Sequence, residues 1–129
     1  MATIFTKIVN GEIPCYKIAE TDDFLAFLDV NPLQEGHTLV VPKTQIDYIY
    51  DLPEDILSEL FIFSKSVAKK IEVSIKCERI GIAVIGLEVP HAHVHLIPLN
   101  TMEDARFIQK VKLSHEEFQE IAKTIQTHL

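Results

Sequence analysis

The segment from His91 to His95 carries three of the chain's six histidines, at every second position. In a β-strand, alternate side chains point to the same face and lie about 7 Å apart, because the rise is about 3.3 Å per residue. We therefore expect residues 91–98 to form a strand that presents three imidazoles on one face. Ala92, Val94 and Leu96 would then point into the core. Imidazole titrates near neutral pH, so three imidazoles on one face indicate a catalytic or binding site.

Three interpretations of the three histidines are open. The rings could be structural, with each one satisfied by hydrogen bonds. They could bind a divalent cation such as zinc, for which imidazole nitrogen is a common ligand, although the nearest carboxylate is Glu88. Alternatively, one ring could act as a nucleophile at phosphorus while its neighbours hold the phosphate. The four glycines form neither a dinucleotide-binding fingerprint nor a P-loop, so any phosphate must be held by side chains.

Composition favours small molecules or proteins as partners. The 129 residues carry a formal net charge of -7 and no run of Lys or Arg, so we expect binding neither to nucleic acid nor to a membrane surface. The length corresponds to one domain. Cys15 and Cys77 form no Cys-x-x-Cys pair, and no apolar run reaches membrane-spanning length. We expect a cytoplasmic protein that needs no cofactor.

The spacing of apolar residues predicts an α+β fold. Two local signals are specific: Gly11 is placed to end a short first helix, and Ser114 with Glu117 forms a capping box. The predicted helices cover residues 6–10, 53–75 and 114–128, and the predicted strands cover residues 15–20, 24–29, 37–42, 80–86 and 91–98. The first three strands should form an antiparallel meander, and the last two a hairpin.

Five blocks of this sequence resemble the histidine triad (HIT) superfamily, and its Hint branch in particular. They are Ile4 to Ile8, Glu12 to Pro14, Phe24 to Val30, Gly36 to Lys43, and the triad from His91 to Leu96. The resemblance implies a HIT-like fold over residues 1–129, with a core at about 4–100 and a C-terminal helical extension at about 101–129. That fold has a five-stranded antiparallel meander sheet, one long central helix and a C-terminal helix.

The same resemblance implies a homodimer formed through the helix at 53–75 and the sheet edge, with Phe61 and Phe63 in or near the interface. It also implies a ligand like AMP, and hydrolysis at the α-phosphate of purine nucleoside phosphoramidates or acyl-adenylates, without a metal. His93 would be the nucleophile and form a covalent nucleotidyl-histidine. His95 and His37 would contact phosphate oxygens, and His91 would orient its neighbours.

The nucleotide-binding residues implied by the resemblance are a ribose ligand, Asp29, and an apolar wall around the base formed by Ile4, Phe5, Ile8, Phe27, Val30 and Leu39. The residues alone support a second interpretation of Asp29, as a cap of the turn before Asn31-Pro32. The apolar residues could equally belong to an ordinary core.

This chain departs from the family pattern at two places. Many relatives hold structural zinc at positions where this chain has Thr3, Thr6 and Gln45, so we expect no zinc site. The loop before the triad is short and places Glu88 where many relatives have a Ser. A carboxylate there could assist a departing amine or repel phosphate. Two alternatives to the hydrolase remain: a nucleotide-binding adaptor with little turnover, and a divalent-metal-dependent hydrolase.

Overall fold

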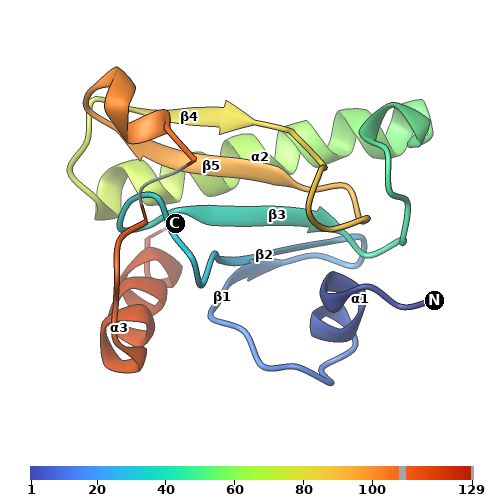
Figure 1. The fold of residues 1–129 in the computed structure, drawn as a ribbon, viewed down its shortest axis with the longest axis horizontal. Helices are drawn as coiled ribbons and strands as arrows, with labels where there is room; N and C mark the ends of the chain where they lie inside the picture. Colours follow the sequence, from blue (N-terminus) through green and yellow to red (C-terminus); the bar gives the residue numbers. More distant parts are fainter. Residues whose placement is uncertain (108–109, 129) are drawn as a thin grey trace.

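The computed structural model describes residues 1–107 and 110–128 and has one five-stranded antiparallel sheet with helices packed on both faces (Figure 1). In chain order the elements are α1 (Ile4–Val9), β1 (Lys17–Glu20), β2 (Phe24–Leu28), β3 (Thr38–Pro42), the 3-10 turn η1 (Ile49–Asp51), α2 (Glu54–Ser74), β4 (Arg79–Ala83), β5 (Val94–Leu99), η2 (Met102–Ala105) and α3 (His115–Gln126). The predicted α+β class is confirmed, with α2 as the long helix and α3 as the C-terminal helix.

The strand order across the sheet is β1-β2-β3-β5-β4. The first three strands form the predicted meander, and β4 and β5 form the predicted antiparallel hairpin. After α2 the chain returns so that β5, not β4, pairs with β3. The strand that follows the histidine segment therefore lies inside the sheet, where both of its neighbours fix its position.

Both faces of the sheet are covered, which explains why every residue of β2 and β3 is buried. On one face, Phe24, Ala26 and Leu28 belong to a core shared with α2 and α3. On the other face, the alternate residues Leu25 and Phe27 pack in a smaller cluster with α1. Figure 1 shows α1 in front of the sheet and α2 behind it.

The first helix, α1, is short, and specific residues mark both of its ends. The Oγ1 of Thr3 accepts a hydrogen bond of 3.1 Å from the backbone N–H of Thr6, which caps the N-terminus of α1. Asn10 ends the helix, and Gly11 follows with a φ of +79°, a conformation that favours glycine. The helix predicted over residues 6–10 begins two residues earlier, at Ile4, because Thr3 caps it.

Helix α2 packs on the sheet through one face. Leu60, Ser64, Val67 and Ile71 are its buried residues and follow the helical repeat. Phe63 also lies on the sheet side, where its ring stacks on Phe24 at a centroid distance of 5.7 Å. Phe61 is 37 % exposed.

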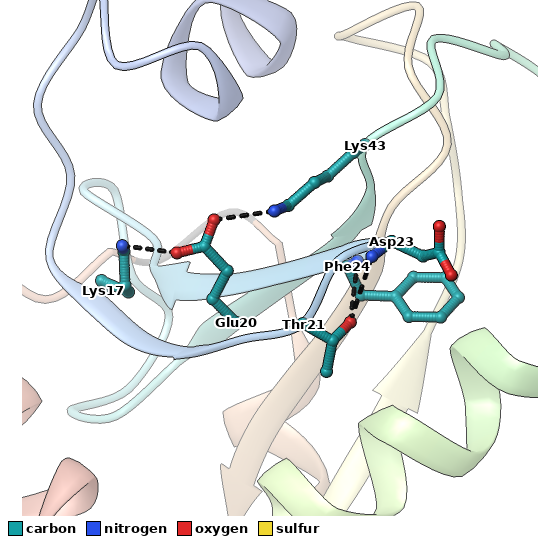
Figure 2. A network of polar contacts seen from close by, with 6 residues as sticks. All are labelled: Lys17, Glu20, Thr21, Asp23, Phe24 and Lys43. Carbon is teal, nitrogen blue, oxygen red and sulfur yellow. Dashed lines mark hydrogen bonds and ion pairs between the residues drawn. The ribbon is translucent and has the colours of Figure 1, made fainter.

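A polar network ties β1 to the end of β3 (Figure 2). Glu20 accepts hydrogen bonds from Lys17 at 2.6 Å and from Lys43 at 2.8 Å, and these ion pairs lower the pKa of its carboxyl group to about 2. The turn between β1 and β2 is closed by Thr21, whose Oγ1 accepts from the backbone N–H of Phe24 at 3.0 Å. Because these groups are largely exposed, the network contributes little to stability and mainly fixes the strand ends.

The expectation of a strand over residues 91–98 is wrong in its first part, because β5 begins only at Val94. Pairing with β3 stops at Val40 and Val94, and Pro42, near the end of β3, has no N–H to extend the ladder. The backbone N–H of Ala92 instead donates to the carbonyl of Ile46 at 2.7 Å. His95 is therefore the one triad histidine within the strand. The expectation for the alternate residues is confirmed: Ala92, Val94 and Leu96 are in the core.

None of the helices in the described ranges combines the length and apolar character needed to cross a membrane.

Candidate active site

A cavity of about 360 Å³ opens on the α1 side of the sheet. Its floor includes Phe27, Leu39 and His95, which pair in register across β2, β3 and β5. Apolar side chains from β2 and β3 thus lie in line with an imidazole on β5. This volume lies in the range of sites for small molecules.

Most of the residues singled out from the sequence meet in this cavity. Ten of the twelve line it: Ile4, Phe5, Ile8, Phe27, Asp29, Val30, Leu39, Glu88, His93 and His95. The other two, His37 and His91, are fully buried. Ile4 and Val30 stand at the rim, since they are 50 % and 61 % exposed. The cavity is therefore apolar at one end and carries imidazoles at the other.

The tautomer of His93 follows from its hydrogen bond. Its Nδ1 lies 2.7 Å from the backbone carbonyl oxygen of His91. A carbonyl oxygen can only accept, so Nδ1 of His93 carries a proton and donates it. In the neutral ring, the lone pair is then on Nε2, which is the atom a nucleophilic imidazole needs.

His37 and His95 form a hydrogen-bonded pair in which the proton positions are fixed. The backbone N–H of Leu33 donates to Nδ1 of His37 at 3.0 Å, so the ring proton of neutral His37 is on Nε2. That Nε2 lies 2.9 Å from Nδ1 of His95 and donates to it. His95 therefore carries its own proton on Nε2, as a donor suited to a phosphate oxygen.

Burial keeps this pair neutral. Desolvation is the main cause that lowers the pKa of His37 to about 4 and that of His95 to about 3. The carboxylate of Asp29, 3.6 Å from Nε2 of His37, acts in the opposite direction. Burial outweighs it, because His37 has no exposed surface. A neutral His37 also agrees with the hydrogen bond from Leu33, which a doubly protonated ring could not accept.

His91 connects the triad to the first helix. Its Nε2 donates to the carbonyl of Pro42 at 2.8 Å, so its Nδ1 accepts from the hydroxyl of Thr3 at 3.0 Å. The hydroxyl of Thr6 donates to the side-chain oxygen of Gln45, which also accepts from the backbone N–H of Thr3 at 3.2 Å. We call the side chains of Thr3, Thr6, Gln45 and His91 the polar cluster.

The polar cluster lies at the positions where the family resemblance implies structural zinc in many relatives. Zinc in proteins takes Cys sulfur, His nitrogen or carboxylate oxygen. Two hydroxyls and an amide do not provide that donor set, and the four side chains satisfy one another by hydrogen bonds. The residues present therefore do not fit structural zinc.

Asp29, His37 and His95 could offer three ligand atoms within 4.8 Å of one another. The hydrogen bond from Leu33 argues against a metal here. Because Nδ1 of His37 accepts that backbone N–H, a metal at Nε2 would have to displace the ring proton and leave an imidazolate. The donor chemistry thus favours a hydrogen-bonded histidine pair at this place.

The turn-capping interpretation of Asp29 is confirmed, and its role as a ribose ligand stays a prediction. Its Oδ1 accepts from the backbone N–H of Asn31 at 2.8 Å, which is the turn-capping role. Its side chain is 16 % exposed and lines the cavity, and Oδ2 takes no part in that turn. One carboxylate can therefore hold the turn and still accept a hydroxyl from a ligand.

Phe5 links the apolar and imidazole ends of the cavity. Its ring packs edge to face against Phe27 at a centroid distance of 5.7 Å and against His93 at 4.9 Å. The rings of His93 and His95 also pack edge to face, with centroids 4.9 Å apart. The helix that carries Phe5 is the one capped by Thr3.

Sequence reasoning missed two cavity residues in the connector between β5 and α3. The ring of Phe107 packs against His95 at a centroid distance of 5.0 Å, and Lys110 Nζ lies 5.7 Å from the centre of the Phe107 ring. Both residues line the cavity. The connector has no periodic pattern, so no local signal in the sequence indicates this contact. The N–H of Val111 donates to the carbonyl of Pro32 at 2.8 Å and holds the connector here.

Comparisons with known proteins agree with this geometry. The HIT domain matches residues 10–102. An uncharacterized HIT-like protein of Methanocaldococcus jannaschii is 44 % identical over 102 residues, which are 74 % of this chain and 77 % of that protein. The adenosine 5'-monophosphoramidase of Saccharomyces cerevisiae is 38 % identical over 99 residues, 75 % of this chain. The match spans 62 % of the yeast protein's length.

Solved structures resemble the fold over nearly the whole chain. The crystal structure of a HIT-like protein involved in cell-cycle regulation from Bartonella henselae gives a TM-score of 0.85 at 29 % identity. It covers 98 % of this chain and 96 % of that one. With its triad beside the cavity and the HIT domain matched over most of its length, this chain belongs to the HIT family.

Proposed function

We propose that this protein hydrolyses nucleoside 5'-phosphoramidates and releases a nucleoside monophosphate through a covalent intermediate on Nε2 of His93. The observation that carries the proposal is the tautomer of His93, whose Nδ1–H is held by the carbonyl of His91. This leaves Nε2 as the nucleophile without a metal or a separate base. The similarity to a yeast protein named as an adenosine monophosphoramidase supports the substrate class.

The proposed reaction has two displacements at phosphorus. In the first, the lone pair of His93 Nε2 forms an N–P bond while the P–N bond to the substrate amine breaks. The amine leaves with that electron pair and takes up a proton from solvent. In the second, water adds to phosphorus, its proton passes to solvent, and the N–P bond to His93 breaks. The products are the amine and the nucleoside monophosphate.

Successive groups along the cavity suit the base, the ribose and the phosphate of a nucleotide. The apolar end around Phe5 and Phe27 accommodates a purine base, and Asp29 accepts ribose hydroxyls. His95 donates its Nε2–H to a phosphate oxygen, with His37 behind it. His37 is fully buried, so we assign it to orienting His95 rather than to direct contact with phosphate.

The dimer expected from the family resemblance is part of this proposal. Phe61 and Ile62 on α2 are 37 % and 68 % exposed, and Ile82 on the edge strand β4 is 57 % exposed. Exposed apolar side chains on a helix and an adjacent edge favour contact with a second copy. Sedimentation at several protein concentrations measures the assembly state directly.

The test is AMP release from adenosine 5'-phosphoramidate by the wild type and by His93→Ala, with and without a strong chelator. We expect turnover that resists the chelator and falls by at least about a thousandfold in the variant, because the covalent route is lost. Mass spectrometry of quenched wild-type enzyme should detect an adenylylated protein. His128→Ala, which removes a histidine near the C-terminal end of α3, is the matched control and should keep full activity.

Each contrary result identifies an alternative. Loss of turnover with the chelator would point to a metal-dependent hydrolase. Turnover in His93→Ala would exclude this residue as the nucleophile. A wild type that binds AMP in calorimetry but releases none from the amide would instead be a nucleotide-binding adaptor.

A further inference from the structure

His93 lines two cavities. Beyond the nucleotide cavity described above lies a second one, of about 380 Å³. Its chemically distinctive lining residues are Asp47, Tyr48 and Tyr50 from the segment before α2, Ile85 and Gly86 from the loop after β4, and His93 itself. None of the first three was assigned a role from the sequence.

The two cavities share part of their walls. Ile85, Gly86 and His93 line both of them. Gly86 has a φ of +75°, and a side chain built there would project into open space. Displacement by Nε2 of His93 puts the leaving group on the opposite side of phosphorus, from where the shared wall of Ile85 and Gly86 continues into the second cavity. In the proposed reaction that leaving group is the amine.

The wall formed by Asp47, Tyr48 and Tyr50 is anchored by the buried residue between the two tyrosines. Ile49 is buried at 8 % exposure, while Tyr48 and Tyr50 on either side are 57 % and 76 % exposed. Their rings pack edge to face with centroids 5.2 Å apart. The carbonyl of Ile46 accepts from the N–H of Ala92 at 2.7 Å, which fixes this segment next to the triad. The segment that carries the two tyrosines is thus attached directly to the triad segment.

The chemistry of the second cavity favours positive charge. Asp47 provides a carboxylate, and the faces of the two tyrosine rings attract cations. Among the described residues that line this cavity there is no Lys or Arg. An anionic leaving group would find no counter-charge here, whereas an ammonium group would find both a carboxylate and aromatic faces.

We propose that the second cavity binds the leaving group of the substrate and favours an amine that carries an additional positive charge. This inference rests on the proposed function. It assigns substrate specificity to the Asp47, Tyr48 and Tyr50 wall. The preferred substrate class is then a nucleoside phosphoramidate of a diamine or of another amine with a distal ammonium group.

A pair of matched substrates tests the preference. In one, AMP is joined through its phosphorus to one nitrogen of 1,4-diaminobutane; in the other, it is joined to pentylamine. The two differ only in a terminal ammonium against a methyl group. We expect wild-type kcat/KM to favour the diamine by about three- to tenfold, the size of one exposed ion pair or cation–π contact. The ratio should decrease as salt is added.

Substitutions in the wall test which residues cause the preference for the diamine substrate. Asp47→Asn should bring the ratio of the two kcat/KM values close to one. Asp51→Asn is the matched control, because Asp51 ends η1 and does not line the cavity, and it should keep the wild-type ratio. Tyr50→Leu should reduce the ratio by a smaller factor, since it removes one aromatic face. AMP affinity in calorimetry checks that each variant is folded.

Unsubstituted adenosine 5'-phosphoramidate separates this inference from the proposed function. If the wild type hydrolyses it but does not discriminate between the two extended substrates, the leaving-group site is wrong and the hydrolase stands. The same follows if Asp47→Asn keeps the preference. If the wild type hydrolyses none of the three amides, the proposed function fails, and the inference fails with it.

Discussion

Nε2 of His37 lies 2.9 Å from Nδ1 of His95, although the two residues are 58 positions apart in the chain. The backbone N–H of Leu33 fixes the direction of this hydrogen bond, because it leaves His37 with a proton only on Nε2. A backbone group in the loop before β3 thus determines which nitrogen of His95 can donate to a substrate. Protonation of this pair should lower the stability of the fold and also reduce turnover.

Acid should destabilise the protein through this pair. A histidine whose pKa is lowered by folding binds more protons in the unfolded state, so its stabilising effect is present above pH 6.5 and is lost as the pH falls toward the folded value. For His37 that value is about 4, with Asp29, His93 and Lys110 as its titratable neighbours. Between pH 7 and pH 4.5 we expect a loss of about 2 kcal/mol in the free energy of unfolding attributable to this site.

Urea unfolding of the wild type and His37→Gln at several pH values measures this loss. Carboxylates that titrate in the same range affect both proteins and cancel in the difference. The gap in stability between the two should be largest at pH 7 and should narrow as the pH falls. A gap that stays constant across the range would contradict the buried, neutral state of His37.

Thr3 should affect catalysis through His91. Thr3→Val keeps the size of the side chain but removes the hydroxyl that caps α1 and donates to Nδ1 of His91. We expect a loss of about 1 to 2 kcal/mol in stability and a lower kcat, because the carbonyl of His91 also orients His93. Thr3→Ser should restore both.

Thr6→Val is the matched control for this change. The Thr6 hydroxyl is 3.4 Å from Nδ1 of His91 and donates to Gln45 instead. A fall confined to kcat in the Thr3 variant, with a shifted ¹⁵N resonance of His91 Nδ1, would identify Thr3 as a positioning residue. If only KM rises, the hydroxyl merely holds the helix that carries Phe5.

Lys110 should strengthen phosphate binding. Among the described residues that line the nucleotide cavity it is the only Lys or Arg, while Asp29 and Glu88 are both acidic. Lys110→Gln should weaken AMP binding by about three- to tenfold and leave adenosine binding unchanged. Lys112→Gln removes the same charge two residues away and should bind AMP as the wild type does. Equal losses in the two lysine variants would indicate a general effect of charge.

Glu88 allows a test of the question that the sequence left open. Glu88 lines the cavity that we propose receives the phosphate. We expect Glu88→Gln to bind AMP about two- to fivefold more tightly, because a repulsive charge is removed. The measurement is calorimetry together with kcat/KM for the amide. A fall of more than tenfold in kcat/KM would instead assign the carboxylate to the departing amine.

The sequence predicts most of this fold because its local signals agree with its long-range contacts. The capping box at Ser114 and the left-handed Gly11 both lie where they were expected, at the ends of α3 and α1. The start of β5 was misplaced because it depends on distant groups, the missing N–H of Pro42 and the carbonyl of Ile46. A periodic pattern in one segment cannot report how its pairing partner ends.

The candidate site likewise contains residues that the sequence pattern predicts and residues that it does not. His93, Asp29 and Phe27 lie in or beside blocks with a recognisable pattern, and they line one cavity. Phe107 reaches the triad only because the connector folds back over His95, and Tyr48 reaches the second cavity only through the turn of η1. Those contacts arise from tertiary packing, so residue types and spacing alone give no sign of them.

The position of β5 between β3 and β4 also determines when the site can form during refolding. The hydrogen bond between His37 and His95 requires α2 and the β4–β5 hairpin to have added to a meander that is local in sequence. Contacts of long sequence separation close the largest loops and are slow to form. After dilution from urea, catalytic activity should therefore return later than the helical circular dichroism signal, and the triad serves as a probe of the last assembled part of the sheet.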